Sequence, residues 1–137
     1  MRNIVVDSGP FIALYNGADK YHQAAREFIR SVQYPLYTNI SVLTEAVYLL
    51  DFDIRAQVDF LRWVYQAVHI DDTTANDLPR VIEILQKYAD LPADFTDASL
   101  IALCERLKTN LVATVDSDFT IYRDAAKQPF INTFFEC

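Results

Sequence analysis

Short apolar runs alternate along the chain with longer segments in which apolar residues recur every three or four positions. The run at residues 3–7, Asn-Ile-Val-Val-Asp, is apolar on both faces, which is typical of a strand in the middle of a parallel sheet. Further strands are predicted at residues 36–38, 68–70, 110–115 and 130–134.

Helical periodicity fills the segments between these runs. It predicts helices over residues 9–16, 21–32 and 41–50. Two more helices are predicted, each from one apolar face. The first face consists of Val58, Leu61, Tyr65 and Val68, and the second of Leu78, Val81, Ile82 and Leu85. A last helix follows Pro92, with a buried stripe at Leu100, Leu103, Cys104 and Leu107. Strands that alternate with helices predict an α/β fold, a three-layer α/β/α sandwich around a parallel sheet.

Length and composition narrow the possible functions. The 137 residues, 52% of them hydrophobic, fit one domain over residues 1–137 with a real core. Only two glycines are present, which excludes the glycine-rich phosphate-binding loops. Two Cys and two His, all far apart, exclude a dedicated zinc site and suit a reduced protein. Since no signal-peptide region or run of 18 apolar residues occurs, we expect a cytoplasmic protein with no membrane partner.

The charge of the chain is dominated by aspartate. It has 19 acidic against 12 basic residues, a net charge of −7, and 14 of the acids are Asp. Asp is a poor helix former, so this excess indicates caps, turns and metal sites as well as solvated surface. Asp7 and Asp116 directly follow the two most apolar strands, and ligands bind outside the carboxyl ends of parallel strands. We therefore expect both at one edge of the sheet, although each could instead only cap a helix.

Three more acids are candidates for the same edge. Glu45 lies in the early turns of the helix that follows strand 36–38, where an ordinary exposed position is the alternative. Asp94 and Asp97 share a face at the start of the last long helix. Asp94 suits an N-cap equally well, whereas Asp97 borders the buried face and favours a functional role. Asp118 is an outer candidate only.

Clustered carboxylates without Cys or His partners have one evident chemical use. They raise one another's pKa unless a cation compensates them, and Mg²⁺ and Mn²⁺ prefer oxygen ligands. Two such ions roughly 4 Å apart activate water and stabilise the leaving oxygen in phosphodiester cleavage. The layout therefore suits metal-assisted phosphodiester hydrolysis.

Four acidic motifs follow one another along the chain: Ile-Val-Val-Asp7-Ser8, Ser41-Val-Leu-Thr-Glu45, Asp94-Phe-Thr-Asp97-Ala-Ser-Leu-Ile and Ala-Thr-Val-Asp116-Ser-Asp118-Phe119. Together they resemble the PIN-domain nucleases, most of all the VapC-type toxins of prokaryotic toxin–antitoxin modules. The resemblance spans nearly the whole chain. It implies a Rossmann-like sandwich with about five parallel strands and an endoribonuclease activity that depends on Mg²⁺ or Mn²⁺.

The resemblance also implies residue roles. The four catalytic acids would be Asp7, Glu45, Asp97 and Asp116, and the metal ligands would be Asp7, Asp94, Asp97 and Asp116. Ser8 matches a hydroxyl residue that could orient a metal-bound water. Whether Asp116 or Asp118 is the fourth acid stays open, with Asp116 favoured because it leaves the strand first. The family further implies a homodimer and a small antitoxin partner that fills the groove, often with a basic side chain.

A net charge of −7 is a poor match for an RNA substrate, because Lys and Arg normally neutralise the phosphates. Two divalent ions would offset four negative charges, and the remaining cations would come from residues such as Arg55, Arg62, Arg123 or Lys127.

Other functions compete with this one. A haloacid-dehalogenase-like phosphatase would want a second Asp two residues after Asp7, where Gly9 stands. A response-regulator receiver needs an acidic pair before the strand-end Asp and a later Lys, and neither fits. A catalytically weak PIN-fold module that binds RNA or a partner remains an alternative.

Overall fold

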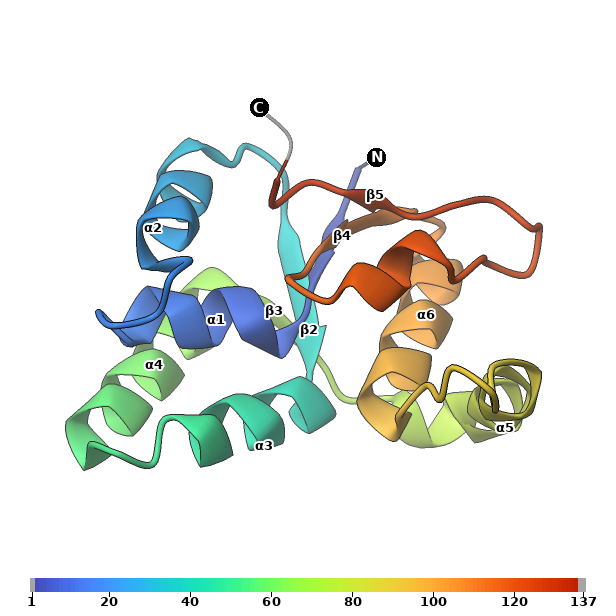
Figure 1. Ribbon diagram of the computed structural model, residues 1–137, viewed down its shortest axis with the longest axis horizontal. Coiled ribbons are helices and arrows are strands. Elements are labelled where there is room, and N and C mark those ends of the chain that lie inside the picture. Colours follow the sequence, from blue (N-terminus) through green and yellow to red (C-terminus); the bar gives the residue numbers. More distant parts are fainter. Residues whose placement is uncertain (1, 136–137) are drawn as a thin grey trace.

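A parallel sheet forms the centre of the molecule in the computed structural model, which describes residues 2–135 (Figure 1). Within these residues the sheet has five strands, β1 (Ile4–Val6), β2 (Leu36–Asn39), β3 (His69–Asp71), β4 (Leu111–Ala113) and β5 (Ile131–Asn132). Their order is β3-β2-β1-β4-β5, and every neighbouring pair is parallel. The predicted parallel sheet is confirmed, and β1 at its centre is buried on both faces.

Strands β4 and β5 are shorter than predicted because the side chain of Asn132, and not a strand backbone, bonds to the backbone of Thr114. The amide of Asn132 bonds to the backbone of Thr114, accepting from its N–H at 3.2 Å and donating to its carbonyl at 2.9 Å. Regular pairing therefore ends at Ala113 and Asn132.

Helices cover both faces of the sheet. They are α1 (Ser8–Tyr15), α2 (His22–Ser31), α3 (Ile40–Leu49), α4 (Ile54–Ala67), α5 (Leu78–Lys87) and α6 (Phe95–Leu107), with short 3₁₀ helices η1 (Thr74–Asp77) and η2 (Ser117–Thr120) among the described residues. Figure 1 shows α1, α2 and α4 on one side, α5 and α6 on the other, and α3 below the carboxyl end of β2. The predicted three-layer sandwich is thus confirmed.

Two helices bury a face that matches the predicted one only in part. In α4 the core residues are Phe60 and Val64, whereas Tyr65 is 82% exposed. Phe60 is selected because it packs against the aromatic rings of Phe11 and Tyr15 in α1. Similarly, α5 buries Val81 and Ile84 and leaves Leu78 and Ile82 exposed.

Helix α6 is more deeply placed than a single buried stripe predicts. All its residues from Thr96 to Cys104 are buried, because α6 packs against the sheet, α5 and α3. Cys104 is therefore a core residue, and Cys137 lies outside the described residues. In the part of the chain that the structure describes, no helix has both the length and the apolarity needed to cross a membrane.

Candidate functional site

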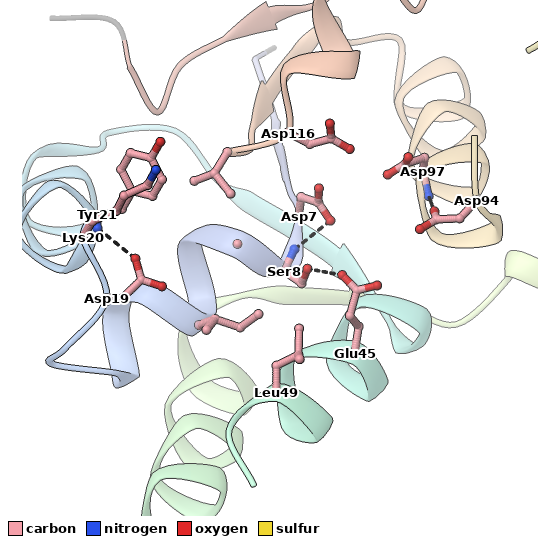
Figure 2. A pocket seen from close by; sticks show the side chains of 13 residues that line it. Asp7, Ser8, Asp19, Lys20, Tyr21, Glu45, Leu49, Asp94, Asp97 and Asp116 are labelled. Atoms are coloured by element: carbon pink, nitrogen blue, oxygen red, sulfur yellow. Dashed lines mark hydrogen bonds between the residues drawn. The ribbon is translucent and has the colours of Figure 1, made fainter. Parts of the chain in front are cut away.

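The carboxyl ends of β1 and β4 open into a pocket of about 560 Å³, which we call the carboxylate pocket. Six acids line it, one of them Asp19 from the turn before α2, and Figure 2 shows their side chains. The pocket brings together all five acids singled out from the sequence, namely Asp7, Glu45, Asp94, Asp97 and Asp116. The expected meeting of acids at one sheet edge is therefore what the structure shows.

Asp7 is fixed through both of its oxygens. It caps α1 by accepting a hydrogen bond from the Ser8 N–H at 2.7 Å, and its other oxygen accepts from the Thr114 hydroxyl at 3.0 Å. Burial raises the pKa of Asp7 to about 6, and the negative charges of Glu45 and Asp116 add to the rise, while the two hydrogen bonds oppose it. The carboxylate of Asp7 thus serves both as the N-cap of α1 and as a residue of the carboxylate pocket.

Asp97 lies across the pocket in the first turn of α6. One of its oxygens, Oδ2, accepts a hydrogen bond at 2.9 Å from the hydroxyl of Tyr122. Burial raises the pKa of Asp97 to about 7, helped by the charges of Asp94, Asp7 and Asp116 and opposed by the Tyr122 hydrogen bond. Two buried carboxylates with raised pKa values therefore face one pocket.

Tyr122 is a site residue that sequence reasoning missed. It is fully buried, and its ring packs edge-on against Phe119 and Tyr88 with centroids 5.0 Å away. Burial and the charge of Asp97 raise the pKa of Tyr122, so its hydroxyl stays protonated and donates to that carboxylate. No motif marks it, because its contact with Asp97 depends on how the chain after η2 returns to α6.

Asp94 serves as the N-cap of α6 and also lines the pocket. Its Oδ1 accepts a hydrogen bond at 2.8 Å from the backbone N–H of Asp97. The two alternatives considered for Asp94, a cap and a pocket residue, are therefore compatible in this fold.

Glu45 reaches the pocket from the second turn of α3, where its carboxylate accepts a hydrogen bond from the Ser8 hydroxyl (Figure 2). This contact ties α3 to the start of α1. On the opposite side, Asn39 caps α3 and donates to the Ser99 hydroxyl of α6 at 2.9 Å. The position of Glu45 is thus set by bonds to both neighbouring helices.

The structure distinguishes the two candidates for the fourth acid by their position. Asp116 lines the carboxylate pocket, and its Oδ1 accepts a hydrogen bond from the Asp118 N–H at 2.9 Å. Among the described residues, Asp118 is not part of the pocket lining. Its place in η2 leaves Asp116 as the acid nearer the other carboxylates.

The basic residues expected to neutralise RNA phosphates lie outside the carboxylate pocket, and a different basic residue lines it. Within residues 2–135, none of Arg55, Arg62, Arg123 and Lys127 lines the carboxylate pocket. Arg123 is held by the backbone carbonyls of residues 120–122, and Arg55 pairs with Asp53. Lys20 lines the pocket instead, with its Nζ 5.0 Å from the ring centroid of Tyr21. Sequence reasoning missed Lys20 and a sixth acid of the pocket, Asp19, because both stand in an unmarked turn between α1 and α2.

The donor set suits a hard divalent cation, although it does not form a closed cage. The raised pKa values of Asp7 and Asp97 indicate that the protein alone compensates their charges poorly. Yet in the described residues no three His, Cys, Asp or Glu side chains are grouped so as to hold a metal ion. Mg²⁺ commonly takes only one or two carboxylates and completes its coordination with water and phosphate oxygens. The pocket fits that open mode of binding.

Comparisons with known proteins agree with this architecture. The family model described as PIN domain matches residues 4–125. Ribonuclease VapC6 of Methanocaldococcus jannaschii is 28% identical over 142 aligned positions, which cover 85% of this chain and 90% of the relative. The crystal structure of VapC20 from Mycobacterium tuberculosis, described as a sarcin–ricin loop cleaving toxin, matches with a TM-score of 0.79 and 25% identity. That match covers 86% of this chain and 93% of the other.

Proposed function

Because the chain belongs to the PIN-domain family, we propose that it is a Mg²⁺- or Mn²⁺-dependent endoribonuclease that hydrolyses RNA phosphodiester bonds. The observation that carries the proposal is the meeting of five acids in one pocket at the carboxyl ends of the strands. The proposed catalytic acids are Asp7, Glu45, Asp97 and Asp116, and the proposed metal ligands are Asp7 and Asp97, with Asp94 and Asp116 beside them. The similarity to a ribonuclease and to a loop-cleaving toxin supports this activity.

The protein groups prepare the site for this chemistry. A bound divalent cation would make a coordinated water more acidic and offset charge on the phosphate. The Ser8 N–H and the Thr114 hydroxyl hold Asp7 in one orientation. Tyr122 occupies one oxygen of Asp97 and leaves the other for the pocket. Glu45 accepts a hydrogen bond from the Ser8 hydroxyl at Oε1, so its Oε2 remains to accept a proton from the attacking water.

We further propose that the enzyme is the toxin of a toxin–antitoxin pair and acts in the cytoplasm as a homodimer. The VapC-type relatives support this role. A pocket lined by six acids suits a basic side chain from a small antitoxin protein. An apolar groove lined by Leu43, Leu61 and Tyr65 between α3 and α4 offers a surface for a second copy.

One observation favours a second candidate function. The acids of the described residues are not arranged to enclose a metal ion without help from water or substrate. A catalytically weak PIN-fold module that binds RNA or a protein partner would need no such ion. The two candidates differ in whether RNA is cut.

The test is RNA cleavage by the purified, partner-free protein with Mg²⁺ or Mn²⁺. Wild type is expected to cut mixed RNAs, and Asp7→Asn and Asp97→Asn are expected to lose at least a hundredfold in rate, in line with the loss of a metal ligand. Asp51→Asn is the matched control, since Asp51 is exposed and lies outside the carboxylate pocket. Folded Asp7 and Asp97 variants that cut as fast as wild type would show that the site is wrongly assigned.

A further inference from the structure

A second cavity, of about 470 Å³, adjoins the carboxylate pocket on the side of β4 and β5. We call it the aromatic pocket, because Tyr21, Phe119, Phe130 and Phe135 line it. Tyr21, Val115 and Asp116 line both cavities, so the two are direct neighbours. A ligand bound at the carboxylates therefore lies close to the aromatic pocket.

The walls of the aromatic pocket are held in place by aromatic packing. On one side, Phe119 and Phe130 are buried and lie 6.0 Å apart with their rings nearly perpendicular. On the other side, Tyr21 packs against Phe134 and Phe135 with centroids 6.4 Å and 5.4 Å away. Phe135 nonetheless keeps half of its surface exposed. A preformed, largely apolar cavity with a partly open ring at its edge results.

The charges around the aromatic pocket favour a neutral, flat group. In residues 2–135 its lining includes no Lys or Arg, and its one acid, Asp116, stands at the border with the carboxylate pocket. The Asn132 amide is already bonded to the backbone of Thr114 and Phe134, so it has little capacity to bind a ligand. A phosphate would find no cation there, whereas an aromatic ring would find stacking partners.

A cation is available where a backbone phosphate would lie. Lys20 borders the carboxylate pocket next to Tyr21, one of the residues that line both cavities. A nucleotide that places its base in the aromatic pocket would therefore bring an adjoining phosphate toward Lys20 and the carboxylates. Aromatic rings beside basic groups are the usual composition of single-strand binding sites.

We propose that the aromatic pocket binds an unpaired nucleobase of an RNA strand, next to the phosphate presented to the carboxylates. The part of this assignment that concerns the neighbouring phosphate rests on the proposed ribonuclease function. The cavity volume is within the range of small-ligand pockets. A base paired inside a helix cannot enter such a cavity, so the nucleotide bound at this position is unpaired. Since stacking dominates the contact, sequence preference at this position is weak.

Photo-crosslinking tests the proposal without requiring cleavage. Single-stranded RNA octamers with one 5-iodouridine, moved through each position, are bound to wild-type protein in Ca²⁺ and irradiated, and crosslinked residues are mapped by mass spectrometry. The expected products join the base to Tyr21 or Phe135. Phe135→Ala should weaken octamer binding about tenfold, as expected for the loss of one stacking ring. Phe52→Ala is the control, since Phe52 is at least as exposed as Phe135 but lies in the turn between α3 and α4.

The outcomes separate this inference from the proposed function. Crosslinks confined to residues outside the aromatic pocket, or wild-type affinity in Phe135→Ala, overturn the nucleobase assignment even if the protein cuts RNA. Crosslinks at Tyr21 that weaken in Phe135→Ala but not in Phe52→Ala uphold the assignment, even if no RNA is cut and the nuclease proposal fails.

Discussion

At the scale of single residues, two buried carboxylates dominate the electrostatics of the site. Asp7 and Asp97 are each only 7% exposed, and both have neighbouring negative charges. Ionising them in the metal-free protein is unfavourable, which is why their pKa values rise to about 6 and about 7. The same arrangement favours a divalent cation, since the cation removes the penalty.

This electrostatic cost predicts a pH dependence of stability. Because the pKa of Asp97 is about 7 in the folded chain against 3.8 for an ordinary Asp, its contribution to stability is complete below pH 3.8 and is lost as the pH rises through 7. In EDTA the midpoint of thermal unfolding should therefore fall between about pH 4 and pH 7 and level off above that. Asp97→Asn should flatten that fall, and Asp51→Asn should not. Identical pH profiles for wild type and Asp97→Asn would contradict the charge assignment.

Tyr122 is expected to act as a positioning residue for Asp97. Tyr122→Phe keeps the ring that packs against Phe119 and Tyr88 but removes the donor to Asp97. Loss of such a supporting hydrogen bond typically weakens metal binding about 10- to 100-fold. We expect that loss in Mn²⁺ affinity measured by isothermal titration calorimetry.

The control for Tyr122 is Tyr15→Phe, because Tyr15 packs against Phe60 and Trp63 and does not line the carboxylate pocket. Unchanged Mn²⁺ affinity in Tyr122→Phe, with the protein folded, would show that the hydroxyl has no part in positioning Asp97.

The sequence allowed the acids of the site to be predicted but not their supporting partners. Asp7 and Asp116 directly follow apolar strands, and that position alone places them at the functional edge. Tyr122 and Lys20 carry no such signal, because loops outside the regular elements set their positions. Residues that depend on tertiary folding of loops are the ones that the pattern could not reveal.

At the scale of elements, the site depends on a close approach between the start of α1 and the chain after β4. A Cβ added at Gly9 would overlap Cγ2 of Val115 and lie 3.3 Å from its Cβ. Gly9 thus permits α1 to pack where Asp7 and Asp116 can face the same pocket. The glycine is needed here for space, since its backbone does not require a left-handed conformation.

Gly9→Ala is therefore expected to destabilise the fold by about 1–3 kcal/mol through overpacking, as measured by chemical denaturation. Combining it with Val115→Ala should recover most of the loss, because the second change removes the methyl groups that clash. A double variant whose loss equals the sum of the two single losses would contradict this contact, since independent sites add.

The elements themselves were largely predictable, whereas the buried faces of two helices were not. Strong periodicity gave the number and order of the long helices and strands. In α4 two apolar faces compete, and the neighbouring aromatic rings of α1 decide in favour of Phe60 over Tyr65. That choice depends on which helix lies next to α4 in space, which local spacing does not encode.

At the scale of the whole molecule, a net charge of −7 requires that cations be brought to an RNA strand. Lys20 is the basic residue that the described chain contributes to the carboxylate pocket. The remaining compensation would come from divalent ions held by the acids. In the proposed nuclease, such ions would reconcile the acidity of the chain with an RNA substrate.

Lys20→Ala should accordingly weaken single-stranded RNA binding in Ca²⁺ and reduce the salt dependence of log K by about 0.7, the value of one phosphate contact. Fluorescence anisotropy over a salt series measures this slope. Lys87→Ala on α5 serves as the control, since Lys87 lies outside the carboxylate pocket. Equal slopes for Lys20→Ala and wild type would place the RNA backbone elsewhere.

Anomalous diffraction at the manganese edge, from crystals soaked in Mn²⁺, tests most directly whether the carboxylates of this pocket hold the divalent cation. We expect an anomalous peak in contact with carboxylate oxygens of Asp7 and Asp97, and no such peak in crystals of Asp97→Asn. Crystals saturated with Mn²⁺ that show no peak in the carboxylate pocket would contradict the proposed metal site.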